Sequence, residues 1–234
     1  MDKVFFLEII INKPQLFEAI IEFNCNLLYN VMIQTAEEMA SFIDATPGFD
    51  NSFIQKLALR GIALKKERLM ETEYCFWDFM EETRRIALLE PETVRRLQLV
   101  FGAAINADEI AKVLRRDEVL QLQQILGQDL YQYSLLRGRY QVGAVRRFFL
   151  AQSHSIPLIT RIHWDGRMAL EICASSWPSV LQSIFFSQLN FVFSTEDSAV
   201  LSQDYPSPVI KGVWDGLKKI LLREVAPQWA PIFD

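Results

Sequence analysis

Residues 209–225, with the sequence VIKGVWDGLKKILLREV, carry the clearest structural signal in the chain. Apolar side chains recur there every three or four positions, and charged residues fill most of the positions between them. This spacing is typical of an amphipathic helix that packs one face against a core. Pro227 follows two residues later and ends the predicted helix.

The same spacing extends outward from this segment over most of the chain. It predicts helices at residues 13–23, 26–44, 74–89, 91–105 and 143–153, and a helix from 180 to 193 that Pro178 separates from the one before it. Asp117 is expected to cap another helix, which carries Leu120, Ile125 and Leu126 on its apolar side. We therefore expect an all-α fold of roughly nine to eleven helices with little or no sheet.

Local signals set several of the expected boundaries. Pro91 suits the first turn of its helix, and Asn106 followed by Glu109 resembles a capping box. Residues 156–159 are compatible with an extended segment, after which Asp165 restarts a helix. The stretch 194–208 is rich in Ser, Asp and Pro and predicts a loop.

Composition indicates a folded chain with a substantial core. Half of the 234 residues are hydrophobic, 17 are Phe, and Gly and Pro number only nine each. This length favours one helical domain over residues 1–234, with two packed lobes (1–88 and 89–234) as the alternative.

Charge and hydropathy narrow the expected partners and location. A net charge of −5 argues against nucleic acid as a partner, because phosphate binding requires a basic excess. Residues 172–195 carry no charge, but their Ser, Gln and Asn side chains favour a buried helix over a membrane span. Glu8 interrupts the apolar N-terminus, and no cleavage site follows it. We expect a cytoplasmic protein without membrane insertion.

The sequence offers little catalytic chemistry. Cys25, Cys75 and Cys173 are widely spaced, so neither a disulfide framework nor a zinc site is expected. Motifs for phosphate binding, acyl transfer and zinc hydrolysis are absent. His163, beside Trp164 and Asp165, is the one place where a base, an aromatic ring and a carboxylate crowd together. A small helical enzyme using His163 is the less favoured hypothesis; we expect no catalytic, cofactor-binding or metal-binding residue.

Basic residues are concentrated in the middle third of the chain. They either solubilise helix ends or form a basic face that docks an acidic protein surface. The C-terminal aromatic residues either fold back on the core or meet a partner. The candidate partner-binding residues are Arg115, Arg116, Arg137, Arg139, Arg146, Arg147, Trp229 and Phe233.

Several segments of the chain resemble the YscK/SctK family of the bacterial type III secretion sorting platform. The similarity lies in Leu89-Glu90-Pro91-Glu92 with the helix after it, in Ala107-Asp108-Glu109-Ile110, in 126–137 and in 221–233. Upstream, Phe23-Asn24-Cys25 with Tyr29 is similar to the start of the family, although Cys25 stands where proline is usual.

The resemblance implies a non-enzymatic adaptor at the cytosolic face of the inner membrane. Such a protein would bridge the cytoplasmic domain of the inner-membrane ring protein to the cytosolic pod protein beneath the export gate. The family carries no catalytic residues over to this chain. A type III secretion chaperone or regulator that holds an unfolded effector segment is the alternative.

Overall fold

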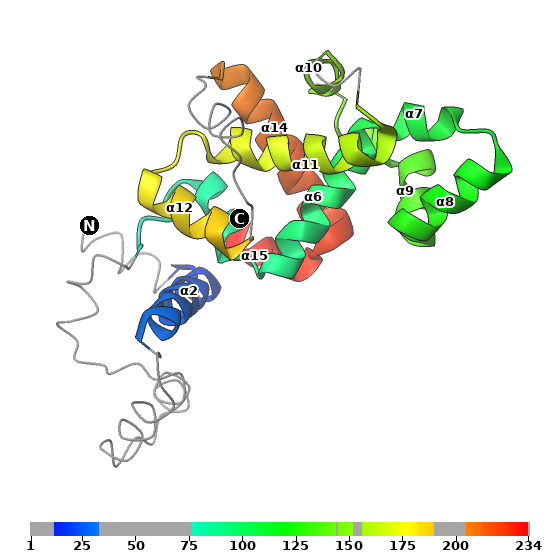
Figure 1. Ribbon diagram of the computed structural model, residues 1–234. Coiled ribbons are helices and arrows are strands. Elements are labelled where there is room, and N and C mark those ends of the chain that lie inside the picture. Colours follow the sequence, from blue (N-terminus) through cyan, green and yellow to red (C-terminus); the bar gives the residue numbers. More distant parts are fainter. Residues whose placement is uncertain (1–11, 33–75, 144, 152–155, 190–204, 234) are drawn as a thin grey trace, which may run out of the picture. The chain divides into compact units, whose positions relative to one another are not determined.

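The computed structural model of the protein describes residues 12–32, 76–143, 145–151, 156–189 and 205–233. Its contacts divide the chain into an N-terminal unit, Met1–Glu81, and a C-terminal unit, Glu82–Asp234. Every regular element within the described residues is a helix, and none is a strand (Figure 1). The expected all-α fold is therefore confirmed.

The described part of the N-terminal unit is built on one helix, α2 (Pro14–Met32). The predicted break between residues 23 and 26 is wrong, because α2 continues through Asn24 without interruption. The buried side chain of Asn24 donates to the carbonyl oxygen of Ile20, 3.0 Å away and one turn earlier. An asparagine that is satisfied in this way does not end a helix. The predicted turn at 46–51 and the rest of the 26–44 helix lie outside the described residues.

Asn24 also holds the segment that follows Cys75. Its side-chain amide donates to the Phe76 carbonyl oxygen, and its Oδ1 atom accepts from the Phe76 backbone N–H, both at 2.8 Å. The Phe79 ring meets those of Phe23 and Phe76 edge to face, with centroids 5.4 and 5.3 Å apart. These bonds occupy backbone groups that a helix would need. The predicted helix over 74–89 is therefore wrong: residues 76–80 are not helical, and only the 3₁₀ helix η1 (Glu82–Leu88) follows.

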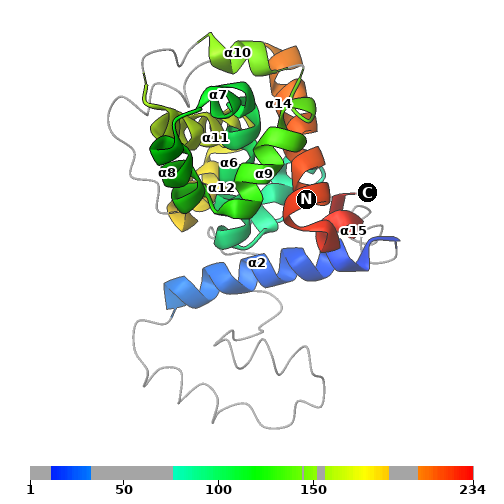
Figure 2. The ribbon, with the colours of Figure 1, turned by 90° about the vertical axis from the view of Figure 1, so that its right-hand side faces the viewer.

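The C-terminal unit is a set of short helices around three longer ones. Figures 1 and 2 show α6 and α11 crossing, and α14 packs against both. In chain order the elements after η1 are α6 (Pro91–Ile105), α7 (Ala107–Lys112), α8 (Arg116–Leu126), α9 (Gln128–Leu136), the 3₁₀ helix η2 (Gly138–Tyr140), α10 (Arg146–Leu150), α11 (Leu158–Ala174), α12 (Ser179–Gln188), α14 (Ser207–Ile220), the π-helical turn η3 (Leu221–Val225), the 3₁₀ helix η4 (Pro227–Trp229) and α15 (Ala230–Phe233). The predicted start of a helix at Pro91 is confirmed.

Two glycines bring the backbones of α6 and α11 into contact. A Cβ atom on Gly102 would lie 1.8 Å from the Ile162 carbonyl oxygen. A Cβ atom on Gly166 would lie 2.0 Å from the Gln98 carbonyl oxygen. Only glycine permits so close an approach. The Gln98 side chain then donates across the crossing to the His163 carbonyl oxygen at 3.1 Å.

A buried polar pair lies one turn further along the same crossing. Asn106 and Asp165 are both fully buried, and the Asn106 Nδ2 atom donates to Asp165 Oδ2 at 2.6 Å and to the Gly102 carbonyl oxygen at 3.0 Å. The predicted capping box is therefore wrong. Asn106 does precede α7, but its side chain caps no N–H of that helix because it is committed to Asp165 and Gly102.

The start of α11 differs from the expectation. Residues 158 and 159 are helical rather than extended, and Asp165 lies inside one continuous helix. Pro157 immediately precedes the first helical residue and has a non-helical ψ of 143°. Its ring fixes φ at about −65°, which suits a position just before a helix. Pro178 separates α11 from α12 as predicted. α12 ends at Gln188, and the predicted end at residue 193 lies outside the described residues.

The predicted helix over 209–225 is confirmed, with a change of geometry at its end. α14 is followed directly by the π turn η3, in which the Ala226 N–H reaches the Leu221 carbonyl oxygen at 2.8 Å. Among the described residues, no helix is both long and apolar enough to cross a lipid bilayer.

The C-terminal residues fold back onto η1 and α14. Phe233 is 1% exposed and lies against Trp214, with ring centroids 5.9 Å apart. Arg85 donates to the Ile232 carbonyl oxygen at 2.8 Å, and Lys218 donates to that of Phe233 at 2.9 Å. Of the two alternatives for the tail, folding back on the core or meeting a partner, Phe233 takes the first and packs on the core.

Shortening Phe233 tests how firmly the tail is held. We expect Phe233→Leu to lower the free energy of unfolding by about 1–2 kcal/mol, because it removes part of a buried ring and its contact with Trp214. Urea unfolding followed by circular dichroism measures the change. A variant as stable as the parent would contradict the packing seen here.

Candidate partner-binding surface

A surface cup joins two parts of the chain that lie far apart in sequence. α9 ends at Leu136, and Arg137 to Gln141 run through the 3₁₀ turn η2. Gly138 lets this turn press against α6, since a Cβ there would lie 3.2 Å from Ala104 Cα. The opposite wall is the end of α14 with the π turn η3, a rare element that is frequent at functional sites.

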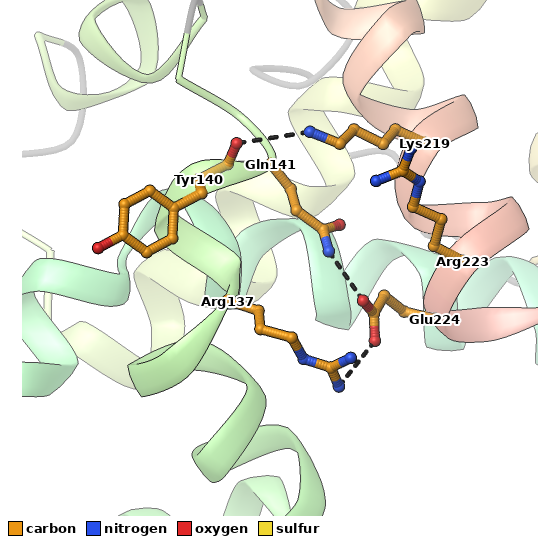
Figure 3. Close-up of a pocket in the computed structure, with 6 residues that line it drawn as sticks. All are labelled: Arg137, Tyr140, Gln141, Lys219, Arg223 and Glu224. Atoms are coloured by element: carbon orange, nitrogen blue, oxygen red, sulfur yellow. Dashed lines mark hydrogen bonds and ion pairs between the residues drawn. The ribbon is translucent and has the colours of Figure 1, made fainter.

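The cup has a volume of about 410 Å³ and is lined by residues whose side chains end in charged or polar groups (Figure 3). We call it the Glu224 cup. Its lining residues are Arg137, Tyr140, Gln141, Lys219, Arg223 and Glu224.

Glu224 links the two walls of the cup. Its Oε2 atom pairs with Arg137 Nη2 at 3.0 Å, and its Oε1 atom accepts from Gln141 Nε2 at 2.8 Å (Figure 3). The Glu224 side chain is only 12% exposed, whereas that of Arg137 is 63% exposed. A charge-assisted pair with a partly buried carboxylate is stronger than one between two exposed groups. Glu224 therefore orients Arg137 and Gln141.

Tyr133 contacts both Gln141 and Arg137. Its hydroxyl donates to Gln141 Oε1 at 3.3 Å, and its ring lies 5.8 Å from the Arg137 guanidinium carbon. Burial, with the nearby Glu224 carboxylate, raises the pKa of Tyr133 above its usual range. The hydroxyl consequently remains a neutral donor at physiological pH.

Two cations at the cup are poorly neutralised. The Lys219 ammonium lies 3.5 Å from the Tyr140 carbonyl oxygen, a distance at the limit of a hydrogen bond. Arg223 is exposed and has no ion-pair partner within the described residues. Together with Arg137 they supply three positive charges against the single negative charge of Glu224, which gives a net charge of +2 in a chain whose net charge is −5.

Of the other candidate arginines, two meet at Asp108. Arg146 pairs with Asp108 Oδ2 at 2.6 Å and donates to the Ile105 carbonyl oxygen at 3.0 Å, so it closes the end of α6. Arg139 lies 3.9 Å from Asp108 and stacks 4.9 Å from the centre of the exposed Tyr140 ring. Arg146 is thus largely a structural residue, whereas Arg139 borders the Glu224 cup.

The remaining candidates lie elsewhere. Arg115 makes local ion pairs with Asp117 and Glu118 at 3.2 and 3.4 Å. Arg116 and Arg147 are exposed on α8 and α10, away from the cup lining. Trp229 is half-buried and Phe233 is buried, so Trp229 is the more accessible of the two tail aromatics.

The histidine cluster considered for catalysis does not assemble. His163 is exposed, whereas Asp165 is buried against Asn106. Residues two apart on a helix point about 200° apart, so the imidazole and the carboxylate face different sides of α11.

A second hollow, of about 460 Å³, is mainly apolar. It lies between α8 and the start of α11 and is lined by Val113, Glu118, Gln121, Leu122, Ile125, Pro157, Leu158 and Ile159. Leu120 and Ile125 were expected on the buried face of α8, and this prediction is wrong. Both are about half exposed. Leu126 is buried as predicted, and Leu122 is buried with it.

Sequence reasoning found Arg137 and missed most of the other cup residues. Lys219 and Arg223 are four residues apart and so share a helix face, which was the available signal. The sequence held no signal that residues 137–141 and 219–224 meet, because more than 75 residues separate them.

Comparison of the chain with protein-family models, with curated proteins and with solved structures found no match.

Proposed function

We propose that the protein is a non-enzymatic adaptor of the bacterial type III secretion sorting platform. It bridges the cytoplasmic domain of the inner-membrane ring protein to the cytosolic pod protein, at the cytosolic face of the inner membrane. The resemblance to the YscK/SctK family is the source of these partners.

The Glu224 cup is the observation that supports an adaptor role. It is an open surface site with two poorly neutralised cations, Lys219 and Arg223, and an arginine held by Glu224. Arginine and lysine beside an oriented ion pair are suited to recognising an acidic protein surface.

Co-purification tests the adaptor role directly. The tagged full chain, co-expressed with the pod protein and the cytoplasmic domain of the ring protein, is expected to capture each partner alone and both together. Reversing both cup cations, in Lys219→Glu/Arg223→Glu, is expected to weaken capture of one partner on the order of tenfold, because like charges then face one another. Quantitative pull-down at constant ionic strength measures the loss.

A second double reversal controls for the change in net charge. Arg96→Glu/Lys211→Glu alters two exposed residues outside the cup by the same four charges, and it is expected to leave capture within twofold of the parent. Equal losses in both variants would exclude a specific role for the cup. If the parent captures neither partner, the adaptor proposal fails; a homodimer that holds an unfolded effector segment would favour the chaperone alternative.

A further inference from the structure

Glu224 uses only some of the hydrogen-bond donors in the cup. Its carboxylate engages one Nη atom of Arg137 and the amide of Gln141. A guanidinium carries five N–H donors. The mostly exposed Arg137 can therefore bind a second carboxylate, either beside Glu224 or in its place. An incoming carboxylate thus competes for an arginine that is already oriented.

Lys219 and Arg223 form a second point of attraction for an anion. They lie four residues apart, on α14 and its π turn, and belong to the same cup wall (Figure 3). Like charges at this spacing repel each other. A carboxylate placed between them would remove that repulsion, which the described residues leave largely uncompensated.

We infer that the Glu224 cup binds an acidic peptide segment of a partner protein through two carboxylates, one held by Lys219 and Arg223 and the other by Arg137 in competition with Glu224. The inference rests on the proposed function, because it names the chemistry of the partner segment that meets the adaptor. Acidic side chains suit the net charge of +2, and spaced carboxylates match cations that lie on two walls.

Glu224 acts in this scheme as an internal place-holder. It keeps Arg137 and Gln141 in position while the cup is empty, and it lowers the affinity for any other carboxylate. Replacing it by glutamine retains a carbonyl that accepts from Gln141 but raises the net charge of the cup from +2 to +3. A place-holder and a purely structural Glu224 therefore predict opposite effects on anion binding.

Peptide binding to the full chain tests the inference. The probe is a fluorescein-labelled decapeptide of alternating Glu and Gly, with a Gln–Gly decapeptide as the matched neutral control, followed by fluorescence anisotropy at 50 mM salt. We expect the Glu–Gly peptide to bind and the Gln–Gly peptide not to bind. Lys219→Glu/Arg223→Glu should weaken binding on the order of tenfold, Glu224→Gln should strengthen it about threefold, and Arg96→Glu/Lys211→Glu should change it less than twofold.

Several outcomes would overturn the inference. They are equal binding of the two peptides, weaker binding to Glu224→Gln with its fold intact by circular dichroism, and a Lys219→Glu/Arg223→Glu variant that binds as the parent does. Displacement of the peptide by millimolar inorganic phosphate, but not by chloride at the same ionic strength, would assign the cup to small anions instead. If ring or pod protein is still captured in any of these cases, the peptide inference fails while the adaptor role stands. If the parent binds the peptide but captures neither ring nor pod protein, the adaptor role fails while the peptide inference stands.

Discussion

Replacing Gly102 with alanine is expected to lower the free energy of unfolding by at least about 3 kcal/mol. The added Cβ atom would lie 1.8 Å from the Ile162 carbonyl oxygen. This oxygen belongs to the backbone of α11, so it cannot move aside as a side chain would, and the two helices must separate. The loss exceeds the gain of about 1 kcal/mol that alanine brings to a helix interior. Urea unfolding followed by far-ultraviolet circular dichroism measures the change.

Two further variants show whether the helix crossing is the cause. Gly166→Ala places a Cβ atom 2.0 Å from the Gln98 carbonyl oxygen and should be similarly damaging. The double variant should lose less than the sum of the single losses, because one separation of α6 and α11 relieves both clashes. Gly143→Ala is the control, since a Cβ there meets nothing within 4 Å. A Gly102→Ala protein more stable than the parent would contradict the close crossing.

Replacing Asp165 with asparagine is expected to stabilise the protein at pH 8 by about 3 kcal/mol and to have no effect near pH 3. Burial raises the pKa of Asp165 to about 6, against the lowering effects of the Asn106 hydrogen bond and of Arg161. Because one pKa unit corresponds to about 1.4 kcal/mol, the rise from 3.8 to about 6 amounts to about 3 kcal/mol.

The sign follows from the protons bound in each state. Between pH 3.8 and about 6 the folded protein holds the Asp165 proton and the unfolded chain has released it. The stability contributed by Asp165 is therefore full below pH 3.8, falls as the pH rises, and is lost above about pH 6. An asparagine has no such proton, so the difference between the two proteins should appear over this interval.

Hydrogen bonding favours the same substitution. Asn106 Oδ1 and Asp165 Oδ1 are buried and have no hydrogen-bond partner within the described residues. An ionised carboxylate offers no donor to such atoms, whereas an asparagine amide supplies one. Asp215→Asn is the matched control, because it removes one exposed carboxylate from α14 and changes the net charge equally. A stability difference between parent and Asp165→Asn that stays constant from pH 3 to pH 8 would contradict the raised pKa.

The amount of structure that the sequence predicted depends on the distance between the residues concerned. Two boundaries were predicted from local signals: the start of one helix at Pro91 and the end of the last long helix near Val225. In both cases the apolar spacing and a proline within a few positions of the boundary were sufficient. The predicted helix over 74–89 failed because Asn24, 52 residues earlier, binds the backbone of Phe76. The capping box at Asn106 failed because its side chain is bound by Asp165, 59 residues later.

The candidate site follows the same rule. Arg137 and Arg139 stood out as a basic pair, and the C-terminal helix was predicted with its apolar face. That Arg146 closes the end of α6, while Arg137 meets Glu224, was not visible in the pattern of charges. A run of basic residues gives their number but not the carbonyls and carboxylates that they will meet.

The sequence by itself determined that this chain forms amphipathic helices, because helical periodicity is a local property of residues three and four apart. Only the tertiary structure decided which polar groups are buried, where α6 and α11 touch through Gly102 and Gly166, and that residues 137–141 and 219–224 make one cup. Such contacts depend on how helices with similar apolar faces pack together, and many pairings satisfy the same spacing until side-chain volume and buried hydrogen bonds select one.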